Sequence, residues 1–427
     1  MADQLKDALN VPGKLDRRRF LGVAAGTAGA MLIKPSLVRG AEANSALRIG
    51  LLGCGGRGTD DATVFVNSAN ARIVALADLF QDQLDTARAH FDTLQQAKGY
   101  PALDPSQLFV GPNAYQEIAA SKELDAVVIA TPPYYHVQHL DAVVAAGKHV
   151  YVEKPVAVDV PGAKKVLEIG KRAEGKLSLD VGFQIRECPL FVEVVKRIQS
   201  GAIGEVACGE AHYFGGYISR PAWPNASPTE RRLRNWIYDR TLSGDIIVEQ
   251  NIHVIDVCNW VLQAHPLKAS ATGGRLARPE DGDVYGNYNV IYYYPGGIDV
   301  TFSSTQFSKG WSDMNERFFG TKGTSQSPYS GPLGIWGDEP WQPDPVIDPA
   351  TGKPVSNLAQ ADPAKKLAFV ESITSGNFHN QAAQGVETAI TCMMAREAAY
   401  TGHDVTWEEI NKSTEVYDPH IDLNNLS

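Results

Sequence analysis

Leu47-Arg48-Ile49-Gly50-Leu51-Leu52-Gly53-Cys54-Gly55-Gly56-Arg57-Gly58 is the stretch of this 427-residue chain that decides its fold. The first half is a short apolar run, which predicts a buried parallel strand. The second half has the spacing Gly53-x-Gly55-x-x-Gly58 and opens a predicted helix that runs to about Asn67. A glycine turn between a strand and a helix is where backbone amides bind phosphate. The stretch therefore predicts a dinucleotide-binding βαβ unit.

Strands and helices continue to alternate after this turn. Apolar runs predict strands at 73–77, 125–130, 149–152 and 178–181, and helical patterns fall at about 81–95 and 136–146. Alternation of this kind predicts right-handed crossovers and a doubly wound parallel sheet. We assign residues 44–168 to this Rossmann domain.

The turn and the second strand together indicate which cofactor binds. Gly53 permits a tight turn, Gly55 lets the backbone approach a pyrophosphate, and Gly58 allows close packing of helix on strand. Asp78 ends the second strand, 20 residues after Gly58, where an acid accepts hydrogen bonds from the adenosine ribose. No Arg or Lys occurs in the nine residues after Asp78, which favours NAD over NADP. The alternative is a glycine turn without a ligand.

The second half of the chain has a different pattern. Residues 205–214, 287–294 and 297–304 are apolar or alternating and rich in β-branched and aromatic residues, and Tyr294-Pro295-Gly296-Gly297 predicts a hairpin connection. We expect an α+β domain over 169–427 with a large, mostly antiparallel open sheet. Residues 324–362 are rich in Pro, Gly and Ser and predict a long irregular loop.

The N-terminus carries an export pattern. Asp16-Arg17-Arg18-Arg19-Phe20-Leu21 is similar to the twin-arginine consensus. The apolar run 20–33 has 14 residues, too short for a stable membrane anchor, which needs about 20. Ala41-Glu42-Ala43 predicts cleavage before Asn44. We expect residues 1–43 to be a signal peptide, the twin-arginine machinery to be a partner, and the mature protein to be periplasmic. An amphipathic N-terminal helix is the alternative.

Composition limits the partners further. Beyond residue 43 the chain has 45 acidic and 32 basic residues, a net charge of −13, and no Lys/Arg-rich run. This balance argues against nucleic acid or an anionic membrane as a partner. The five cysteines are an odd number without a CxxC pair, so we expect free thiols used as small core residues.

Polar residues follow the later strands of the predicted parallel sheet. Thr131-Pro132-Pro133 ends one strand, and Glu153-Lys154-Pro155 ends the next. Carboxyl ends of parallel strands meet at one edge, where ligands bind, so we expect Lys154 at the reactive end of the cofactor. A solvated surface lysine is the alternative. The predicted cofactor contacts are Gly53, Gly55, Gly56, Arg57, Gly58, Asp78, Thr131, Pro132, His136, Glu153 and Lys154.

These motifs, in this order and spacing, resemble the glucose–fructose oxidoreductase / inositol dehydrogenase / rhizopine-catabolism (Gfo/Idh/MocA) family. The resemblance continues with Gly244-Asp245 and with Glu249-Gln250-Asn251-Ile252-His253-Val254-Ile255-Asp256, which is similar to the family's D-x-x-x-H-x-x-D helix. At the C-terminus, Asn380, Arg396 and residues 402–407 are similar to its exported members.

The resemblance implies catalytic roles. Lys154 is expected to stabilise the developing alkoxide of a substrate hydroxyl, and His253 to accept its proton. Glu249 stands where the family usually has Asp, so its role is open. On a helix, positions 249, 253 and 256 share a face, so one acid is a candidate to orient His253; for Asp256 a packing role is an equally good alternative. Glu249 and His253 supply only two ligands, without a nearby Cys, so no metal site is expected there.

The resemblance also points to substrate contacts. Gln184 and Arg186 match polar positions of the family's sugar site, and the aromatic rings are candidates to stack on a pyranose. Each is an equally good candidate for a core or surface residue. The full set of predicted substrate contacts is Gln184, Arg186, Tyr213, Trp236, Tyr238 and Asn251.

The leading functional hypothesis is an NAD-dependent oxidoreductase that acts on a secondary hydroxyl of a sugar, glycoside or polyol. Export implies a tightly retained cofactor, because no NAD pool recycles it outside the cytoplasm. It is then reset by a second carbonyl substrate, or by transient oxidation and elimination in an NAD-dependent glycosidase. A non-catalytic sugar-binding protein is the third hypothesis. The open sheet of the family implies a homo-oligomer.

Overall fold

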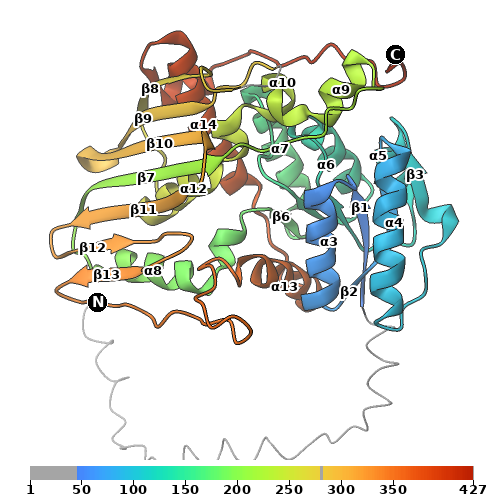
Figure 1. The fold of residues 1–427 in the computed structure, drawn as a ribbon, viewed down its shortest axis with the longest axis horizontal. Coiled ribbons are helices and arrows are strands. Elements are labelled where there is room, and N and C mark those ends of the chain that lie inside the picture. Colours follow the sequence, from blue (N-terminus) through green and yellow to red (C-terminus); the bar gives the residue numbers. More distant parts are fainter. Residues whose placement is uncertain (1–45, 279–281, 427) are drawn as a thin grey trace, which may run out of the picture. The chain divides into compact units, whose positions relative to one another are not determined.

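The computed structural model describes residues 46–278 and 282–426 (Figure 1). The expected signal peptide and its cleavage site lie outside the described residues. Within the described part, two sheets organise the chain. The first is built from residues 47–181 and the second from residues 206–406.

The first sheet is entirely parallel and doubly wound, as expected. Its order is β3-β2-β1-β4-β5-β6. The strands are β1 (Leu47–Leu52), β2 (Ala71–Asp78), β3 (Leu108–Val110), β4 (Ala126–Ile129), β5 (His149–Val152) and β6 (Leu179–Val181). The sequence pattern did not predict β3, which has only three residues. Because β6 belongs to this sheet, the parallel sheet extends beyond residue 168.

Helices connect these strands and cover both faces of the sheet. Their apolar faces bury residues such as Phe65 of α3, Phe91 of α4 and Val166 of α7 against fully buried strand residues. Burial of this apolar area is the main stabilising contribution to the domain. The helices are α3 (Gly56–Ser68), α4 (Gln81–Gln96), α5 (Ala114–Ala120), α6 (His136–Ala145) and α7 (Val160–Ala173).

The second sheet has eight strands in the order β13-β12-β11-β7-β10-β9-β8-β14. All neighbours are antiparallel except the central pair β7 and β10, so the sheet is mostly antiparallel, as expected. The strands are β7 (Val206–Gly216), β8 (Lys268–Gly274), β9 (Asn287–Tyr294), β10 (Ile298–Ser308), β11 (Asp313–Gly320), β12 (Gly323–Gln326), β13 (Gly334–Gly337) and β14 (Val405–Thr406).

Turn chemistry explains the hairpin between β9 and β10. Gly296 and Gly297 have φ values of 80° and 78°, which residues with a Cβ rarely adopt. They connect the antiparallel strands β9 and β10, so the hairpin predicted at 294–297 is confirmed. The region 324–362 is irregular only in part, because β12 and the edge strand β13 lie there.

One face of the large sheet is covered by helices. Along β10, Val300 and Phe302 are buried whereas Asp299 and Thr301 are exposed, the alternation of a sheet with one covered face. Helices α12 and α14 pack on the covered face (Figure 1). The remaining helices are α8 (Pro189–Gln199), α9 (Pro228–Arg234), α10 (Arg240–Ser243), α11 (Ile246–Glu249), α12 (Ile252–Leu262), α13 (Ala361–Ser375), α14 (Ala382–Thr401) and α15 (Trp407–Asn411).

Helix α13 returns the chain to the first domain and inserts two lysines there. Lys365 Nζ lies 2.8 Å from Asp180 Oδ2, and Lys366 Nζ lies 2.6 Å from Asp61 Oδ1. All four side chains are almost completely buried. Buried charges persist only when they are paired, so these contacts fix α13 against α3 and β6.

The described residues also bear on thiols, membranes and metals. All five cysteines are free; four are buried, as expected, but Cys208 is exposed on β7. In residues 46–278 and 282–426, no helix is long and apolar enough to cross a membrane. The same residues contain no group of three His, Cys, Asp or Glu side chains arranged to hold a metal ion.

Candidate active site

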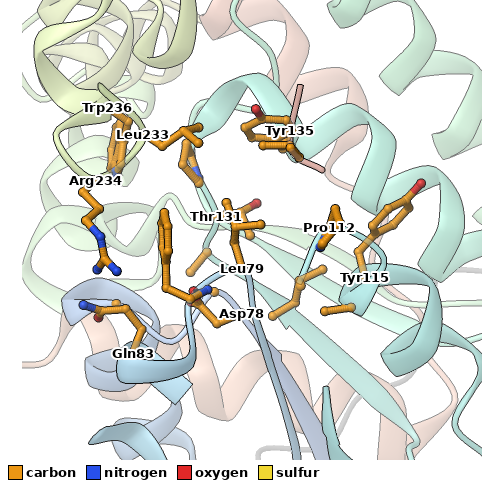
Figure 2. Close-up of a pocket in the computed structure, with 18 of the residues that line it drawn as sticks. Asp78, Leu79, Gln83, Pro112, Tyr115, Thr131, Tyr135, Leu233, Arg234 and Trp236 are labelled. Carbon is orange, nitrogen blue, oxygen red and sulfur yellow. Dashed lines mark hydrogen bonds between the residues drawn. The ribbon is translucent and has the colours of Figure 1, made fainter. Parts of the chain in front are cut away.

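A cavity of about 320 Å³ opens at the carboxyl ends of the parallel strands (Figure 2). The strand order reverses between β1 and β4, which is where an open α/β sheet forms its ligand crevice. Gly53 follows β1, Asp78 ends β2, and Thr131 follows β4. Figure 2 shows Gln83 and Arg234 toward one end of the cavity and Pro112 and Tyr115 toward the other.

The glycine turn fits a dinucleotide. A Cβ on Gly58 would lie 2.0 Å from the carbonyl oxygen of Gly53, so only glycine allows α3 to pack this closely on the turn. A Cβ on Gly55 or Gly56 would meet nothing within 4 Å, and both residues line the cavity. The turn therefore leaves room for a pyrophosphate beside the N-terminus of α3, whose free amides favour an anion.

Two backbone amides fix the carboxylate of Asp78 at the end of β2, where a ribose would bind. Its Oδ2 accepts a hydrogen bond from the Cys54 amide (2.7 Å), and its Oδ1 accepts one from the Phe80 amide (2.8 Å). Burial raises the pKa of Asp78 above its ordinary value, although the two amides lower it. Each carboxylate oxygen can accept a second hydrogen bond, so the geometry leaves acceptors for ribose hydroxyls.

The cavity includes six of the predicted cofactor residues: Gly53, Gly55, Gly56, Asp78, Thr131 and Pro132. His136 does not line the cavity. The two ring nitrogens of His136 lie 2.7 Å from the carbonyl oxygens of Pro155 and Thr131. His136 thus braces the ends of β4 and β5 against each other, and its nitrogens are not free for a cofactor.

Arg57 and Glu153, two further predicted cofactor contacts, do not line the cavity, and their side chains pair with each other. Arg57 Nη2 lies 3.0 Å from Glu153 Oε1 and 3.0 Å from Asp362 Oδ1. Burial would raise the pKa of Glu153, but the charges of Arg57, Lys154 and Lys366 hold it below its ordinary value. This ionic network joins the glycine turn to the residue that precedes Lys154 and to α13.

Lys154 and Glu249 form the polar centre beyond the cavity. Lys154 Nζ donates to Glu249 Oε1 (2.9 Å) and to the backbone carbonyl of Glu249 (2.5 Å). Both side chains are about nine-tenths buried, so Lys154 is not a solvated surface lysine. A buried ammonium held by a single carboxylate can stabilise negative charge on a reacting oxygen.

His253 is a neutral imidazole in this centre. Burial and the charge of Lys154 lower the pKa of His253 to about 3. Its Nδ1 is buried and has no hydrogen-bond partner among the described residues. Its ring meets the ring of Phe183 edge-on, with centroids 6.3 Å apart. The free ring nitrogen can accept a proton, but a pKa of about 3 makes it a weaker base than the ordinary histidine that the sequence predicted.

The expected helix face through positions 249, 253 and 256 is not formed. Glu249 ends α11, and a break at Gln250–Asn251 separates it from α12, which carries His253. Asp256 does not orient His253, because it binds Arg186 through two bonds of 2.8 and 2.9 Å and accepts a third from Thr388. Arg186, a predicted substrate contact, is therefore committed to Asp256.

Several buried polar atoms of the segments that carry Glu249, His253 and Phe183 have no hydrogen-bond partner among the described residues. They are Glu249 Oε2, both side-chain polar atoms of Asn251, His253 Nδ1 and Gln184 Oε1. Gln184 adjoins Phe183, which contacts His253. Buried polar atoms in native proteins are usually satisfied. This cluster therefore fits a small ligand rich in hydroxyl groups.

The three aromatic residues predicted to contact the substrate do not lie together in the structure. Tyr213 donates to Gln250 Oε1 (3.2 Å), and burial and Glu249 raise its pKa to about 12, so it lies beside the Lys154–Glu249 pair. Trp236 lines the cofactor cavity. Tyr238 donates to the Ile218 carbonyl (2.6 Å) and stacks on Tyr217.

Other residues of the cavity escaped the sequence analysis. Phe80 could have been noticed, because it follows Asp78 closely. Arg220, Trp223, Arg234 and Leu423 lie more than 140 positions from Asp78 in the chain, and only the fold brings them to it.

Comparison with known proteins decides the family. The model of the oxidoreductase family with an NAD-binding Rossmann fold (Gfo/Idh/MocA) matches residues 47–181. The model of the Gfo/Idh/MocA C-terminal domain matches residues 191–326. Together they cover more than half of the chain. The chain belongs to the Gfo/Idh/MocA family. It is an oxidoreductase whose Rossmann domain binds NAD.

Individual relatives of this Gfo/Idh/MocA chain have several activities. Inositol 2-dehydrogenase of Rhizobium meliloti (strain 1021) is 28% identical over 291 residues, 68% of this chain and 78% of the relative. A glycosyl hydrolase family 109 protein of Shewanella putrefaciens is 25% identical over 223 residues, 47% of this chain and 46% of the relative. Levoglucosan dehydrogenase in complex with NADH and levoglucosan shares the fold, with a TM-score of 0.66 at 19% identity over 85% of this chain and 99% of that one.

Proposed function

We propose that this chain oxidises a secondary hydroxyl of a polyol or sugar outside the cytoplasm and keeps its NAD bound between turnovers. The observation that carries the proposal is the buried Lys154–Glu249 pair with the neutral His253 and unpartnered polar atoms around it. The inositol 2-dehydrogenases among its relatives support a polyol substrate.

The residues divide the chemistry among them. When bound, NAD supplies the hydride-accepting group. Lys154 donates to the reacting oxygen and stabilises the negative charge that develops on it. His253, neutral at physiological pH, accepts the hydroxyl proton. Glu249 Oε2 accepts a hydrogen bond from a neighbouring hydroxyl, which favours vicinal diols as substrates.

Lys154→Met tests the proposal. We expect NADH formation with inositols or hexoses to fall by a factor of about a thousand, because one charged donor to the reacting oxygen is lost. Bound NAD, quantified by mass spectrometry after gel filtration, should be unchanged. Lys122→Met removes an exposed lysine and is the matched control. Full turnover by the Lys154 variant would contradict the assigned role.

A glycosidase is the second candidate function, favoured by the similarity to a glycosyl hydrolase family 109 protein. In that case the hydride returns to the sugar within one turnover. Glycosides would then be hydrolysed without net NADH formation and without an added carbonyl acceptor. A keto-sugar formed in step with the reduction of an added acceptor would support the dehydrogenase instead.

Export through the twin-arginine pathway is the proposed route out of the cytoplasm, supported by Arg17, Arg18 and the short apolar run after them. Because this pathway carries folded proteins, NAD can be loaded before export. Replacing both arginines with lysine should keep the chain in the cytoplasm, as cell fractionation would show. Recovery of the double variant in the periplasm would refute this route.

We also propose a homo-oligomer. Ile291 on β9 and Phe319 on β11 are 39% and 38% exposed on the uncovered face of the large sheet. These two residues are separated by β7 and β10 and form no continuous patch, so the support for an oligomer is the uncovered sheet face itself. Light scattering on the purified chain should give a multiple of the monomer mass, and a monomeric mass at micromolar concentration would exclude it.

A further inference from the structure

One wall of the cofactor cavity comes from outside the Rossmann domain. It is made by residues of the segment 220–236 and by Leu423 near the C-terminus. We call residues 220–236 and 417–426 the strap. Figure 2 shows Leu233, Arg234 and Trp236 of the strap across the cavity from Asp78.

Arg234 fastens the first part of the strap to the Rossmann domain. Its Nη1 and Nη2 donate to the two carboxylate oxygens of Asp82 at 3.0 and 2.9 Å, and its Nε donates to Glu230 at 2.6 Å. Its guanidinium also lies over the ring of Phe80, 3.9 Å from the centroid. Phe80 and Asp82 directly follow Asp78, so Arg234 closes the strap at the ribose end of the cavity.

Three of the five N–H donors of Arg234 are bonded to acids within the protein. Two acids occupy its polar edge, and Phe80 and Trp223 lie against its faces at 3.9 and 4.4 Å. The side chain is only 10% exposed. A guanidinium bound to acids of two segments holds those segments together.

The C-terminal part of the strap lies on the first part. Arg232 Nη1 donates to the Pro419 carbonyl (2.6 Å), and Ser227 Oγ donates to the Leu426 carbonyl. Tyr417 is anchored by its amide to Asp159 Oδ2 (2.8 Å). Apolar side chains of both parts form one cluster with the Rossmann residues Leu79, Phe80, Tyr134 and Tyr135; from the strap it includes Leu233, Trp236, Ile421, Leu423 and Leu426.

We propose that the strap is part of the cofactor site and that its opening limits the release of NAD. The dinucleotide leaves only when the Arg234–Asp82 contact and the apolar cluster separate, because together they cover the cavity at the ribose end. The inference rests on the proposed retention of NAD and gives that retention a structural cause. No residue of the strap takes part in proton transfer, so the strap controls binding and not the chemical step.

NADH release from the full chain tests the proposal directly. The purified protein is loaded with NADH and mixed with excess NAD, and the loss of protein-bound NADH fluorescence gives the dissociation rate. Asp82→Asn weakens the contact from the Rossmann side, and Leu423→Ala shortens a side chain of the cavity wall. Because Asp82 is 52% exposed, we expect Asp82→Asn to speed release about fivefold. Leu423→Ala should have an effect of similar size.

Asp125→Asn is the matched control. Asp125 forms an equivalent two-bond pair with Arg48 in the same domain, at 2.8 and 3.1 Å, next to the start of β4 and away from the cavity. Its release rate should equal that of the unchanged chain. The proposal is overturned if neither Asp82→Asn nor Leu423→Ala releases NADH faster than this control.

The release experiment separates the strap from the proposed function. Fast NADH release by the unchanged chain would refute the retention of NAD. The ratio of the NADH dissociation rates of variant and control would still show whether the strap slows release. Failure to oxidise any polyol would refute the proposed substrate class and leave both release rates measurable. If the unchanged chain, the two strap variants and the control all release NADH at the same rate while polyol oxidation is intact, only the proposed role of the strap is rejected.

Discussion

Glu249 is one methylene longer than the aspartate usual at this position of the family. In this chain the extra length lets Oε1 reach within 2.9 Å of Lys154 Nζ while Oε2 stays free for a ligand. We predict that Glu249→Asp retracts the carboxylate and lowers kcat for the preferred polyol about tenfold to a hundredfold, because misplacement by about 1 Å carries that cost. Steady-state kinetics on a panel of inositols and hexoses measures it.

Glu249→Gln is the companion variant. It keeps the length but removes the charge beside Lys154, so it separates the position of the carboxylate from its charge. We expect both variants to bind NAD normally, since Glu249 does not line the cofactor cavity. If Glu249→Asp has the kinetics of the unchanged chain for every polyol, the length of this side chain has no role in the reaction.

Helix α13 depends on ion pairs that the protein buries completely. Lys366 Nζ lies 2.6 Å from both Asp61 and Asp362 and donates to Tyr151 at 3.1 Å. We predict that Lys366→Met lowers the free energy of unfolding by about 3 kcal/mol, because it leaves Asp61 buried without this partner. Chemical denaturation monitored by tryptophan fluorescence measures the change.

Two further variants make this test specific. Adding Asp61→Asn to Lys366→Met should cost less than the sum of the single changes, since the buried charge is removed with its partner. Lys412→Met breaks a pair between exposed side chains, Lys412 and Glu408, and should leave the free energy of unfolding unchanged within error. Equal losses for Lys366→Met and Lys412→Met would show that burial of the pair is irrelevant.

Buried histidines make the whole molecule sensitive to acid. Burial lowers the pKa of His139 and of His253 to about 3. An unfolded histidine has a pKa of about 6.5, so below that pH the unfolded chain binds more protons than the folded chain. Stability should therefore fall as pH falls from about 6.5 toward 3, by up to about 1.4 kcal/mol per pH unit for each histidine.

Denaturation curves at a series of pH values test this sign. His139→Gln removes one buried titrating group, so its free energy of unfolding should fall less steeply below about pH 6.5 than that of the unchanged chain. His420→Gln changes a side chain that is 85% exposed and should keep the original slope. A steeper slope for His139→Gln would mean that the sign is wrong.

Local pattern was enough for the parallel half of the fold. The run Leu47–Leu52, the glycine turn and Asp78 predicted a strand, a phosphate-binding turn and a ribose acceptor, because each depends on residues that are neighbours in the chain. The positions of Lys154 and Thr131 at one sheet edge followed from the same alternation. Short β3 was missed because three residues carry too little periodicity.

Contacts between segments that are distant in the chain could not be predicted from the local sequence pattern. The i, i+4 spacing of Glu249 and His253 predicted one helix, yet the chain breaks at Gln250–Asn251 and Lys154 bonds to the Glu249 carbonyl that ends α11. Arg186 looked like a free polar side chain, but the fold pairs it with Asp256. Hydrogen-bond partners of this kind depend on tertiary packing, which the hydrophobic periodicity of the sequence does not predict.

The amino-acid sequence was sufficient to establish a nucleotide site, because glycine conformations and strand ends are local properties of the backbone. Tertiary packing was needed to bring Arg234 against Asp82 and Leu423 into the wall of the cavity. It also buries His253, which lowers the pKa of this side chain. The reason is physical: burial and long-range pairing depend on which segments meet in space. The chemistry of the turn was encoded locally, whereas the enclosure of its cofactor arises only when both halves of the chain have folded together.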